Sequence, residues 1–373
     1  MSKSKKSPPA KSAPAGAKKA KGGICRIGVI GAGGIAAAQM ERLRKSKRDD
    51  YAVVAACDVD AARASEFAAK WEIGRTFTDW RRLAADPDID AVTICTPNKM
   101  HCAPAVLCAQ SGKHVLVEKP MAMNAREAAQ MCAAARKAGT VMQIGFQQRF
   151  NANAQFLRRA VAEGALGKIL YVRAQALRRL GIPSWGVFGR KDLNGGGPMI
   201  DIGVHILECA HYIMGKPRLT HASGATHTYI GNQKPEVAAP WGAWDHTTYT
   251  VEDLATGYLR FEGGATLTIE SSFAAHIEKD AWNITIMGTK GGATLDPVTI
   301  FTHRNGVQVN ETPTFIGYQD GFDFKMLHWL QVMQDGVESD APGEDGLAVQ
   351  LMLDSVYESA RLGREIAVKT PTI

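Results

Sequence analysis

The pattern in this chain that best fits acid–base chemistry is a carboxylate and an imidazole four residues apart, Asp201 and His205. They follow a triple glycine and lie within residues 198–214, whose apolar periodicity predicts a helix. Side chains at i and i+4 share a helix face, so Asp201 could hold the imidazole in one tautomer and raise its basicity. Such a pair suits a general base that takes a proton from a hydroxyl group while hydride leaves the same carbon.

Two other interpretations of this pair stay open. His205 could be a core histidine with satisfied hydrogen bonds, and Asp201 an acid on the helix surface. Alternatively, Asp201, His205 and Glu208 have the i, i+4, i+7 spacing with which one helix face can ligate a metal ion. The general base is the interpretation that we prefer, and we expect no metal.

A glycine-rich turn near the start of the chain is typical of dinucleotide binding. Residues 26–36 read R-I-G-V-I-G-A-G-G-I-A, so Gly31, Gly33 and Ala36 fill the spacing G-x-G-x-x-G/A. The first glycine permits a tight strand-to-helix turn, the second lets the backbone approach a pyrophosphate, and the small third residue keeps the helix close to the sheet. Without a ligand, the same pattern can simply close a βα unit. The residues expected to contact phosphate are those of the turn and the helix start: Gly31, Gly33, Gly34 and Ile35.

An acidic residue at the end of the next apolar run supports the dinucleotide. Asp58 ends residues 52–58, about twenty residues beyond the glycines, which is the spacing of a partner for the adenosine ribose hydroxyls. No basic residue directly follows it, so a 2′-phosphate would meet an unpaired carboxylate. NAD is therefore favoured over NADP, although Arg63 is near enough in sequence to keep NADP open.

Charged residues directly follow another apolar run, where Glu118, Lys119 and Pro120 come after residues 114–117. Charges buried without partners are costly, so this pair needs either solvent or a function. A solvated ion pair at the surface is one interpretation. In the functional one, Glu118 lies beside the nicotinamide ribose and Lys119 over the substrate, while Pro120 directs the chain and could do so through a cis bond.

The apolar run at residues 91–95 ends in the same way, with a polar segment at the start of a helix. Because ligands bind at the carboxyl ends of parallel strands, we expect this segment to surround the nicotinamide end of the cofactor. The residues concerned are Thr96, Pro97, Asn98 and His101.

The first half of the chain alternates short apolar runs with amphipathic segments, which predicts a doubly wound parallel sheet with helices on both faces. The expected strands are residues 25–30, 52–58, 75–78, 91–95, 114–117 and 141–145. The expected helices are residues 35–46, 61–70, 79–84, 101–111 and 125–138.

The second half changes to the alternating pattern of half-buried strands. A helix ending near Glu163 is followed by expected strands at residues 168–177, 221–230, 246–261, 265–272, 282–287 and 299–303, which read as a meander after the first of them. Paired glycines at 263–264 and 291–292 supply hairpin turns. Helical periodicity returns at residues 321–336 and 344–362, and these helices are expected to close the second domain.

Between these elements lies a long loop, residues 178–197, rich in glycine, arginine and aromatic residues. Loops of this length within a compact domain are usually functional or disordered. Trp185 and Phe188 favour an ordered wall, since sugar C–H faces pack well on aromatic rings. Trp185 could equally do no more than anchor the loop.

Composition limits the classes of function. The first 23 residues hold seven lysines and no acid, and the other 37 basic residues match the 37 acidic ones, so the body of the protein is neutral and nucleic-acid binding is not expected. The tail of residues 1–23 has almost nothing to bury, which predicts disorder. No apolar run approaches the length that crosses a bilayer. Seven scattered cysteines without a C-x-x-C pattern indicate reduced core residues in a cytoplasmic protein.

Several segments together resemble the glucose–fructose oxidoreductase/inositol dehydrogenase (Gfo/Idh/MocA) family. They are G-A-G-G-I-A, C-D-V-D, T-P-N-K-M-H, G-K-H-V-L-V-E-K-P and G-G-G-P-M-I-D-I-G-V-H, which span Gly31 to His205 in the family's order. The resemblance implies a Rossmann domain, expected at residues 24–148, and a C-terminal α+β domain with a large, mostly antiparallel open-faced sheet, expected at residues 149–373.

The resemblance also implies roles for particular residues. The matching Lys, Asp and His form the family's substrate and proton-transfer site, so Lys119, Asp201 and His205 are the expected catalytic residues. Gln148 joins the expected cofactor contacts. Arg149 and Trp185 join the expected substrate contacts, although Arg149 could instead be structural.

The function that follows is an NAD-dependent oxidoreductase acting on a ring hydroxyl of a sugar, glycoside or inositol, with a glucoside 3-dehydrogenase as one possibility. One alternative is a redox-assisted glycosidase that forms a transient ketone on a tightly held NAD and eliminates the aglycone. A second is a non-catalytic dinucleotide-dependent regulator, which would have no need of a paired base. Family members commonly pair subunits through the open sheet, so a homodimer or homotetramer is expected.

Overall fold

The first structural layer is a six-stranded parallel sheet with the strand order β3-β2-β1-β4-β5-β6. The computed structural model describes residues 23–371, so the basic tail expected at residues 1–23 lies, apart from Gly23, outside the described residues. The strands are β1 (Cys25–Ile30), β2 (Tyr51–Cys57), β3 (Arg75–Phe77), β4 (Ala91–Ile94), β5 (His114–Val117) and β6 (Met142–Ile144). Central strands β4 and β5 are buried along their whole length, as apolar runs covered on both faces should be.

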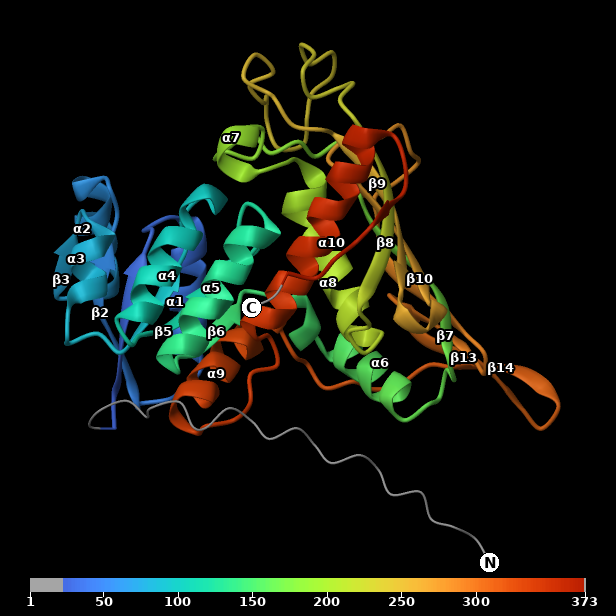
Figure 1. Ribbon diagram of the computed structural model, residues 1–373, viewed down its shortest axis with the longest axis horizontal. Helices are drawn as coiled ribbons and strands as arrows, with labels where there is room; N and C mark the ends of the chain where they lie inside the picture. Colours follow the sequence, from blue (N-terminus) through green and yellow to red (C-terminus); the bar gives the residue numbers. More distant parts are fainter. Residues whose placement is uncertain (1–22, 372–373) are drawn as a thin grey trace, which may run out of the picture.

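Helices cover both faces of this sheet, and the doubly wound prediction is confirmed (Figure 1). The helices between its strands are α1 (Gly34–Lys45), α2 (Ala61–Trp71), α3 (Trp80–Ala85), α4 (Cys102–Gln110) and α5 (Ala125–Ala138). A helix from much later in the chain, α9 (Gly321–Gln334), also packs here. Its Trp329 and Met333 share an apolar cluster with Ile27 of β1 and Met40 of α1. The expectation that this helix closes the second domain is therefore wrong, because its apolar face is buried beside α1.

The second sheet has nine strands in the order β14-β13-β12-β11-β7-β10-β9-β8-β15. Its strands are β7 (Ile169–Leu177), β8 (Leu219–His227), β9 (Leu254–Phe261), β10 (Thr266–Ser272), β11 (Ala281–Gly288), β12 (Gly292–Leu295), β13 (Val298–Arg304), β14 (Val307–Glu311) and β15 (Ile366–Ala367). Only β7 and β10 pair in parallel, and every other pairing is antiparallel. The mostly antiparallel sheet is confirmed.

Two expectations for this sheet need correction. The strands do not form one meander, because β7 lies between β10 and β11 and separates two sets of antiparallel neighbours. The strand expected at residues 246–261 begins only at Leu254. Asp245 holds Thr247 and Thr248 in a polar turn, and the carboxylate of Asp253 accepts hydrogen bonds from the backbone of Tyr229, Ile230 and Gly231. Within this segment the N–H groups of Thr250 and Asp253 donate to the carbonyl groups of Gly189 and His227, outside any regular ladder.

Helices α6 (Ala152–Ala162), α8 (Val204–Ile213) and α10 (Gly343–Leu362) cover one face of the second sheet. Helix α10 runs between the two sheets and contacts both α5 and β8 (Figure 1). A short helix, α7 (Lys191–Asn194), belongs to the loop that reaches back toward the first sheet. Among the described helices, none is long and apolar enough to cross a bilayer.

Candidate active site

The turn between β1 and α1 leaves backbone open to a ligand. Gly31 has φ +93°, and a Cβ there would lie 2.7 Å from the carbonyl oxygen of Cys95, so only glycine fits. At Gly33 and Gly34 an added Cβ would meet no atom within 4 Å. Gly33 caps α1 without a side-chain hydrogen bond, and the first turn of the helix carries no acid. The free N–H groups of this helix start fit a phosphate.

The acid expected to bind ribose lies against this turn. One carboxylate oxygen of Asp58 accepts a hydrogen bond from the backbone N–H of Ala32 at 2.9 Å, and the other accepts one from Asp60 at 3.0 Å. Asp58 therefore holds the glycine turn in place from the end of β2. Arg63 lies 3.7 Å from the same carboxylate and also from that of Asp60, so its charge is already opposed by two acids.

The lysine that follows β5 reaches across to the second half of the chain. The Lys119–Pro120 peptide is cis. The Lys119 Nζ donates hydrogen bonds to the backbone carbonyl of Asp201 at 2.8 Å and to its carboxylate at 2.9 Å. Side chains 82 residues apart in the sequence thus form a mostly buried ion pair.

Asp201 and His205 do not pair as their spacing suggested. Residues Met199–Gly203 form a π-helical turn, and α8 begins only at Val204. A π turn hydrogen-bonds i to i+5, so it is wider than an α turn, and residues four apart no longer stack on one face. The carboxylate of Asp201 turns to Lys119 instead, and the Nδ1 atom of His205 is buried without a hydrogen-bond partner among the described residues.

His205 is nevertheless set up to be neutral. It is 9% exposed, and burial lowers its pKa well below the usual histidine value. The positive charges of Lys119 and Lys325 lower the pKa further, because a second cation nearby is unfavourable. At neutral pH the ring is therefore free to accept a proton.

The triple glycine before the π turn is required by close packing. A Cβ on Gly196 would lie 2.2 Å from the hydroxyl of Tyr357, and one on Gly197 would lie 2.1 Å from the carbonyl oxygen of Glu252. The carboxylate of Glu252 accepts hydrogen bonds from the Gly197 N–H at 3.0 Å and from the Tyr357 hydroxyl at 2.7 Å. Glu252 thereby anchors the turn that carries Asp201. Nothing in the local sequence pattern singled it out.

Glu118 is buried, so the alternative of a solvated ion pair at the surface does not hold for it. It is 5% exposed, and its carboxylate accepts hydrogen bonds from Lys325 at 2.7 Å and from Gln39 at 2.6 Å. Burial by itself would raise the pKa of Glu118, but the ammonium of Lys325 holds it below the usual value. Both hydrogen bonds are accepted by Oε1, so the contact expected between Glu118 and the nicotinamide ribose stays a prediction.

The polar residues after β4 form hydrogen bonds with neighbouring loops. Asn98 is 9% exposed, and its amide donates to the carbonyl and side-chain oxygens of Asn194 at 2.8 and 2.9 Å. His101 is fully buried, and its ring nitrogens lie 2.9 Å from the carbonyl oxygen of Pro120 and 3.0 Å from that of Thr96. His101 therefore braces the two strand-end loops from inside and cannot contact a cofactor directly. Pro97 is exposed, and Thr96 is partly exposed.

Arg149 is structural, and its expected substrate contact is wrong. It is fully buried and pairs with Glu208 at 3.0 Å and with Asp345 at 2.6 Å. Phe146 and Tyr212 lie against its guanidinium. Because Glu208 binds Arg149, it does not complete a ligand set with Asp201 and His205, and within residues 23–371 no group of acids, histidines and cysteines could hold a metal ion. The neighbouring Gln148 is half-buried and accepts a hydrogen bond from Asn151.

The long loop at residues 178–197 is ordered around its aromatic residues. Trp185 packs at 5.4 Å from Trp241 and edge-on at 6.4 Å from Phe188, measured between ring centroids. Its side chain is still 56% exposed. The loop ends in α7, which meets the turn after β4 through Asn194 and Asn98.

Two features meet at the carboxyl edge of the parallel sheet. One is a glycine turn that fits a phosphate, and the other is a lysine–aspartate pair beside a neutral histidine. This combination defines a two-domain, dinucleotide-dependent oxidoreductase. Comparison with known families agrees. A model described as "Oxidoreductase family, NAD-binding Rossmann fold" matches residues 25–146, and one described as "GFO/IDH/MocA C-terminal domain" matches residues 154–294. The chain belongs to the Gfo/Idh/MocA oxidoreductase family, and its cofactor is NAD.

Individual relatives match over nearly the whole chain. It is similar to a D-glucoside 3-dehydrogenase of Escherichia coli, with 36% identity over 91% of this chain and 97% of the relative. A myo-inositol 2-dehydrogenase of Thermotoga maritima is 28% identical over 92% and 98%. The crystal structure of an oxidoreductase domain protein from Kribbella flavida superposes with a TM-score of 0.80 at 28% identity, over 93% of this chain and all of that one. These relatives favour neither the glycosidase nor the regulator.

Proposed function

We propose that the protein oxidises a ring hydroxyl of a sugar or glycoside with NAD, in the manner of a glucoside 3-dehydrogenase, and that inositols are its next best substrate class. The observation that carries this proposal is the Lys119–Asp201 ion pair at the sheet edge, beside a neutral His205. The 36% identity to a D-glucoside 3-dehydrogenase supports the substrate class.

The roles of the three residues follow from their chemistry. The glycine turn and Asp58 would hold NAD, which would supply the hydride acceptor. Lys119 donates a hydrogen bond to the oxygen of the reacting hydroxyl and polarises it. Asp201 holds the ammonium of Lys119 in place through two hydrogen bonds. His205 accepts the hydroxyl proton, and we assign uptake to its Nε2 because Nδ1 is enclosed by protein.

The direct test is reduction of NAD, followed at 340 nm, with a panel of free sugars, methyl glycosides and inositols. At least one hexopyranoside should be oxidised, and a His205→Ala variant should lower kcat by about 100- to 10,000-fold, the range for losing a general base. Product analysis should find one ring ketone per NADH formed. Sugar release without net NADH would instead indicate redox-assisted glycosidase action, and cofactor binding without turnover would indicate a regulator.

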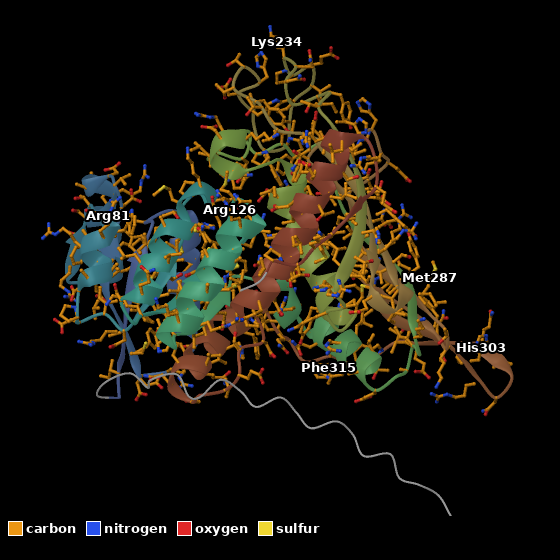
Figure 2. All side chains as sticks on the ribbon, in the orientation of Figure 1. Arg81, Arg126, Lys234, Met287, His303 and Phe315 are labelled. Carbon is orange, nitrogen blue, oxygen red and sulfur yellow. The ribbon has the colours of Figure 1, made fainter. Side chains whose placement is uncertain are left out.

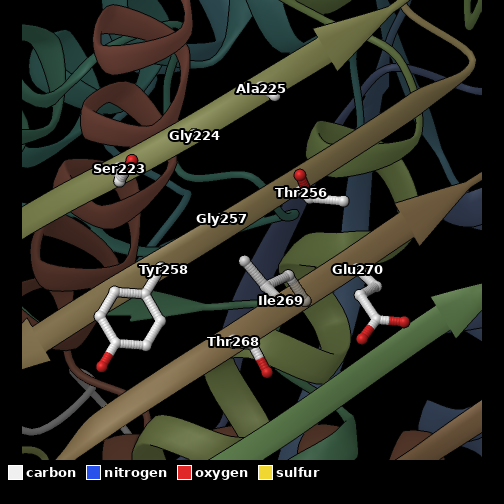
Figure 3. A pocket seen from close by; sticks show the side chains of 9 residues that line it. All are labelled: Ser223, Gly224, Ala225, Thr256, Gly257, Tyr258, Thr268, Ile269 and Glu270. Carbon is white, nitrogen blue, oxygen red and sulfur yellow. The ribbon is translucent and has the colours of Figure 1, made fainter. Parts of the chain in front are cut away.

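We also propose that copies of this chain pair through the outer face of the nine-stranded sheet. The helices cover only its other face. The outer face carries half-buried polar and aromatic side chains around a shallow hollow of about 420 Å³, lined from β8, β9 and β10 by residues such as Thr256, Tyr258, Thr268 and Glu270 (Figure 3). Met287 of β11, 51% exposed, stands on the same sheet (Figure 2). A homodimer or a homotetramer would cover this surface.

The proposal also covers the location of the protein and the boundaries of its two domains. All seven cysteines lie in the described chain and are free thiols, which supports a reducing, cytoplasmic location. We propose that the cofactor-binding unit is residues 24–148 and the substrate-binding unit residues 149–373, with α9 returning from the second to pack on the first.

A further inference from the structure

Two exposed tryptophan rings stand together beside the candidate active site. Trp185 is 56% exposed and Trp241 is 38% exposed, and their ring centroids are 5.4 Å apart. They come from separate segments, residues 178–197, which include α7, and residues 228–253, which lie above α7 in Figure 1. Figure 2 labels Lys234 in the second of them. Large apolar surfaces that stay exposed together commonly mark a binding site.

Both loops are braced, so the rings are held before any ligand arrives. The Thr250 N–H donates to the carbonyl of Gly189 at 2.9 Å, and the Lys191 N–H donates to the Thr250 hydroxyl at 3.0 Å. The indole N–H of the buried Trp244 donates to the carbonyl of Gly231 at 2.7 Å. Binding on a surface that is already ordered loses little side-chain entropy.

An arginine joins the tryptophan pair to the catalytic residues. The guanidinium of Arg178 lies 4.3 Å from the ring centroid of Trp241. The guanidinium donates to the carbonyl of Gly181 at 2.9 Å, and the backbone N–H of Arg178 donates to the carbonyl of Ser272. The adjacent Ser271 donates its hydroxyl to the carbonyl of Pro198, where the π turn of Asp201 starts. The positive charge of Arg178 also contributes to the lowered pKa of His205. Arg178 therefore lies between the aromatic pair and the proton-transfer site.

We propose that Trp185, Trp241 and Arg178 form a subsite for the aglycone of a glycoside, and that this aglycone carries a ring. The inference rests on the proposed function, because it assumes that the oxidised sugar lies at Lys119 and His205. The exposed indole faces pack against a flat or C–H-rich ring, and Arg178 donates hydrogen bonds to oxygens near the glycosidic link. An inositol or a free hexose has no aglycone to place on this surface.

The test compares two glucosides that differ only in the aglycone, phenyl and methyl glucoside, each as both anomers. With Trp185→Ala or Trp241→Ala, kcat/KM for the preferred phenyl glucoside should fall by about ten-fold relative to that for methyl glucoside. The reason is that one aromatic contact strengthens binding by about a factor of ten. Trp241→Phe should restore most of the loss. Trp282→Ala removes a tryptophan of the same 38% exposure from β11 and should leave the ratio unchanged.

A binding arm separates failure of this subsite from failure of the proposed function. Calorimetric titration of phenyl glucoside into the NADH-loaded protein should show weaker binding for Trp185→Ala than for wild type. If no glucoside is oxidised but this difference is found, the proposed function fails while the subsite stands. If both Trp variants alter phenyl and methyl glucosides by the same factor, or neither variant changes binding, the aglycone subsite is refuted.

Discussion

His205 combines near-complete burial with proximity to three cations, and both lower its basicity. A general base works best when its pKa is close to the operating pH, so a strongly lowered pKa sacrifices driving force. In return, the imidazole is neutral over the whole physiological range. Oxidation of the hydroxyl group releases one proton, and an imidazole that is unprotonated at neutral pH can accept it. The direction of the pKa shift thus fits oxidation of an alcohol.

The pH dependence of activity should reflect this shift. Because the active form of His205 is the deprotonated one, and its folded-state pKa is lowered by burial and then by Lys119, Lys325 and Arg178, activity should persist below the ordinary histidine pKa of about 6.5. The acid limb of log kcat/KM against pH should therefore lie below that value.

An Arg178→Met variant removes one of the cations and should move the acid limb upward, toward the ordinary value. The distant and exposed Arg361→Met serves as the matched control and should leave the limb in place. A wild-type limb at or above pH 6.5 with no response to Arg178→Met would contradict the role of His205 as the base.

At the scale of elements, the π turn at Met199–Gly203 decides which partner Asp201 takes. Glu252 and Tyr357 hold its start, and Gly196 and Gly197 allow those two side chains and their backbone to approach it. Burial raises the pKa of Glu252, which suits an anchor that hydrogen-bonds to neutral groups. The catalytic geometry therefore depends on packing against the segment just before β9 and against α10, as well as on local sequence.

A Gly197→Ala variant should show this dependence. Its Cβ would lie 2.1 Å from the Glu252 carbonyl oxygen, so the π turn must shift, at a cost of about 1–3 kcal/mol in the free energy of unfolding. Chemical denaturation should detect that loss. The kcat of the folded variant should also fall, because Asp201 moves with the turn. Gly317→Ala, where an added Cβ meets no atom within 4 Å, is the control and should alter neither quantity.

Helix α9 is a second element with a direct connection to the site. Lys325 is fully buried and ion-pairs with Glu118, the residue just before Lys119. Because the pKa of Glu118 is held below its usual value, this pair stabilises the fold above the ordinary pKa of a glutamate. That contribution is lost as the pH falls through the lowered pKa.

Removing the lysine should destabilise the protein strongly. Lys325→Met leaves a buried, unpaired carboxylate and should cost about 3–5 kcal/mol at neutral pH, measured by denaturation. Lys325→Met with Glu118→Gln should recover part of that loss, since no uncompensated charge remains. Lys137→Met, on the exposed face of α5, is the matched control. A single variant as stable as wild type would show that the pair contributes nothing to the fold.

At the scale of the whole molecule, the outer face of the nine-stranded sheet should decide the oligomeric state. Tyr258→Glu places a charge at the centre of the proposed interface and should convert the oligomer to monomers at micromolar concentration, because charge is disfavoured at the core of an interface. Light scattering after size exclusion measures the mass. Tyr318→Glu, 83% exposed and away from this sheet, should leave the mass unchanged. A wild-type monomer would contradict the proposal outright.

The sequence by itself determined the local parts of this protein. The strand at Cys25–Ile30, the glycine turn after it and the strand at His114–Val117 follow from apolar runs and glycine chemistry within a few neighbouring residues. Parallel strands placed at such positions bring their carboxyl ends to one edge, so the approximate location of Lys119 could be predicted as well.

Only the tertiary structure decided which side chains meet. The Lys119–Asp201 pair spans 82 residues and the Glu118–Lys325 pair spans 207, and neither separation leaves a periodic signal in the sequence. The spacing of Asp201 and His205 suggested a direct pair because an α-helix was assumed, whereas packing of Gly196 and Gly197 against Tyr357 and Glu252 accompanies a π turn. Buried charges take whichever partner the fold supplies, since leaving one unpaired costs more than any local preference contributes.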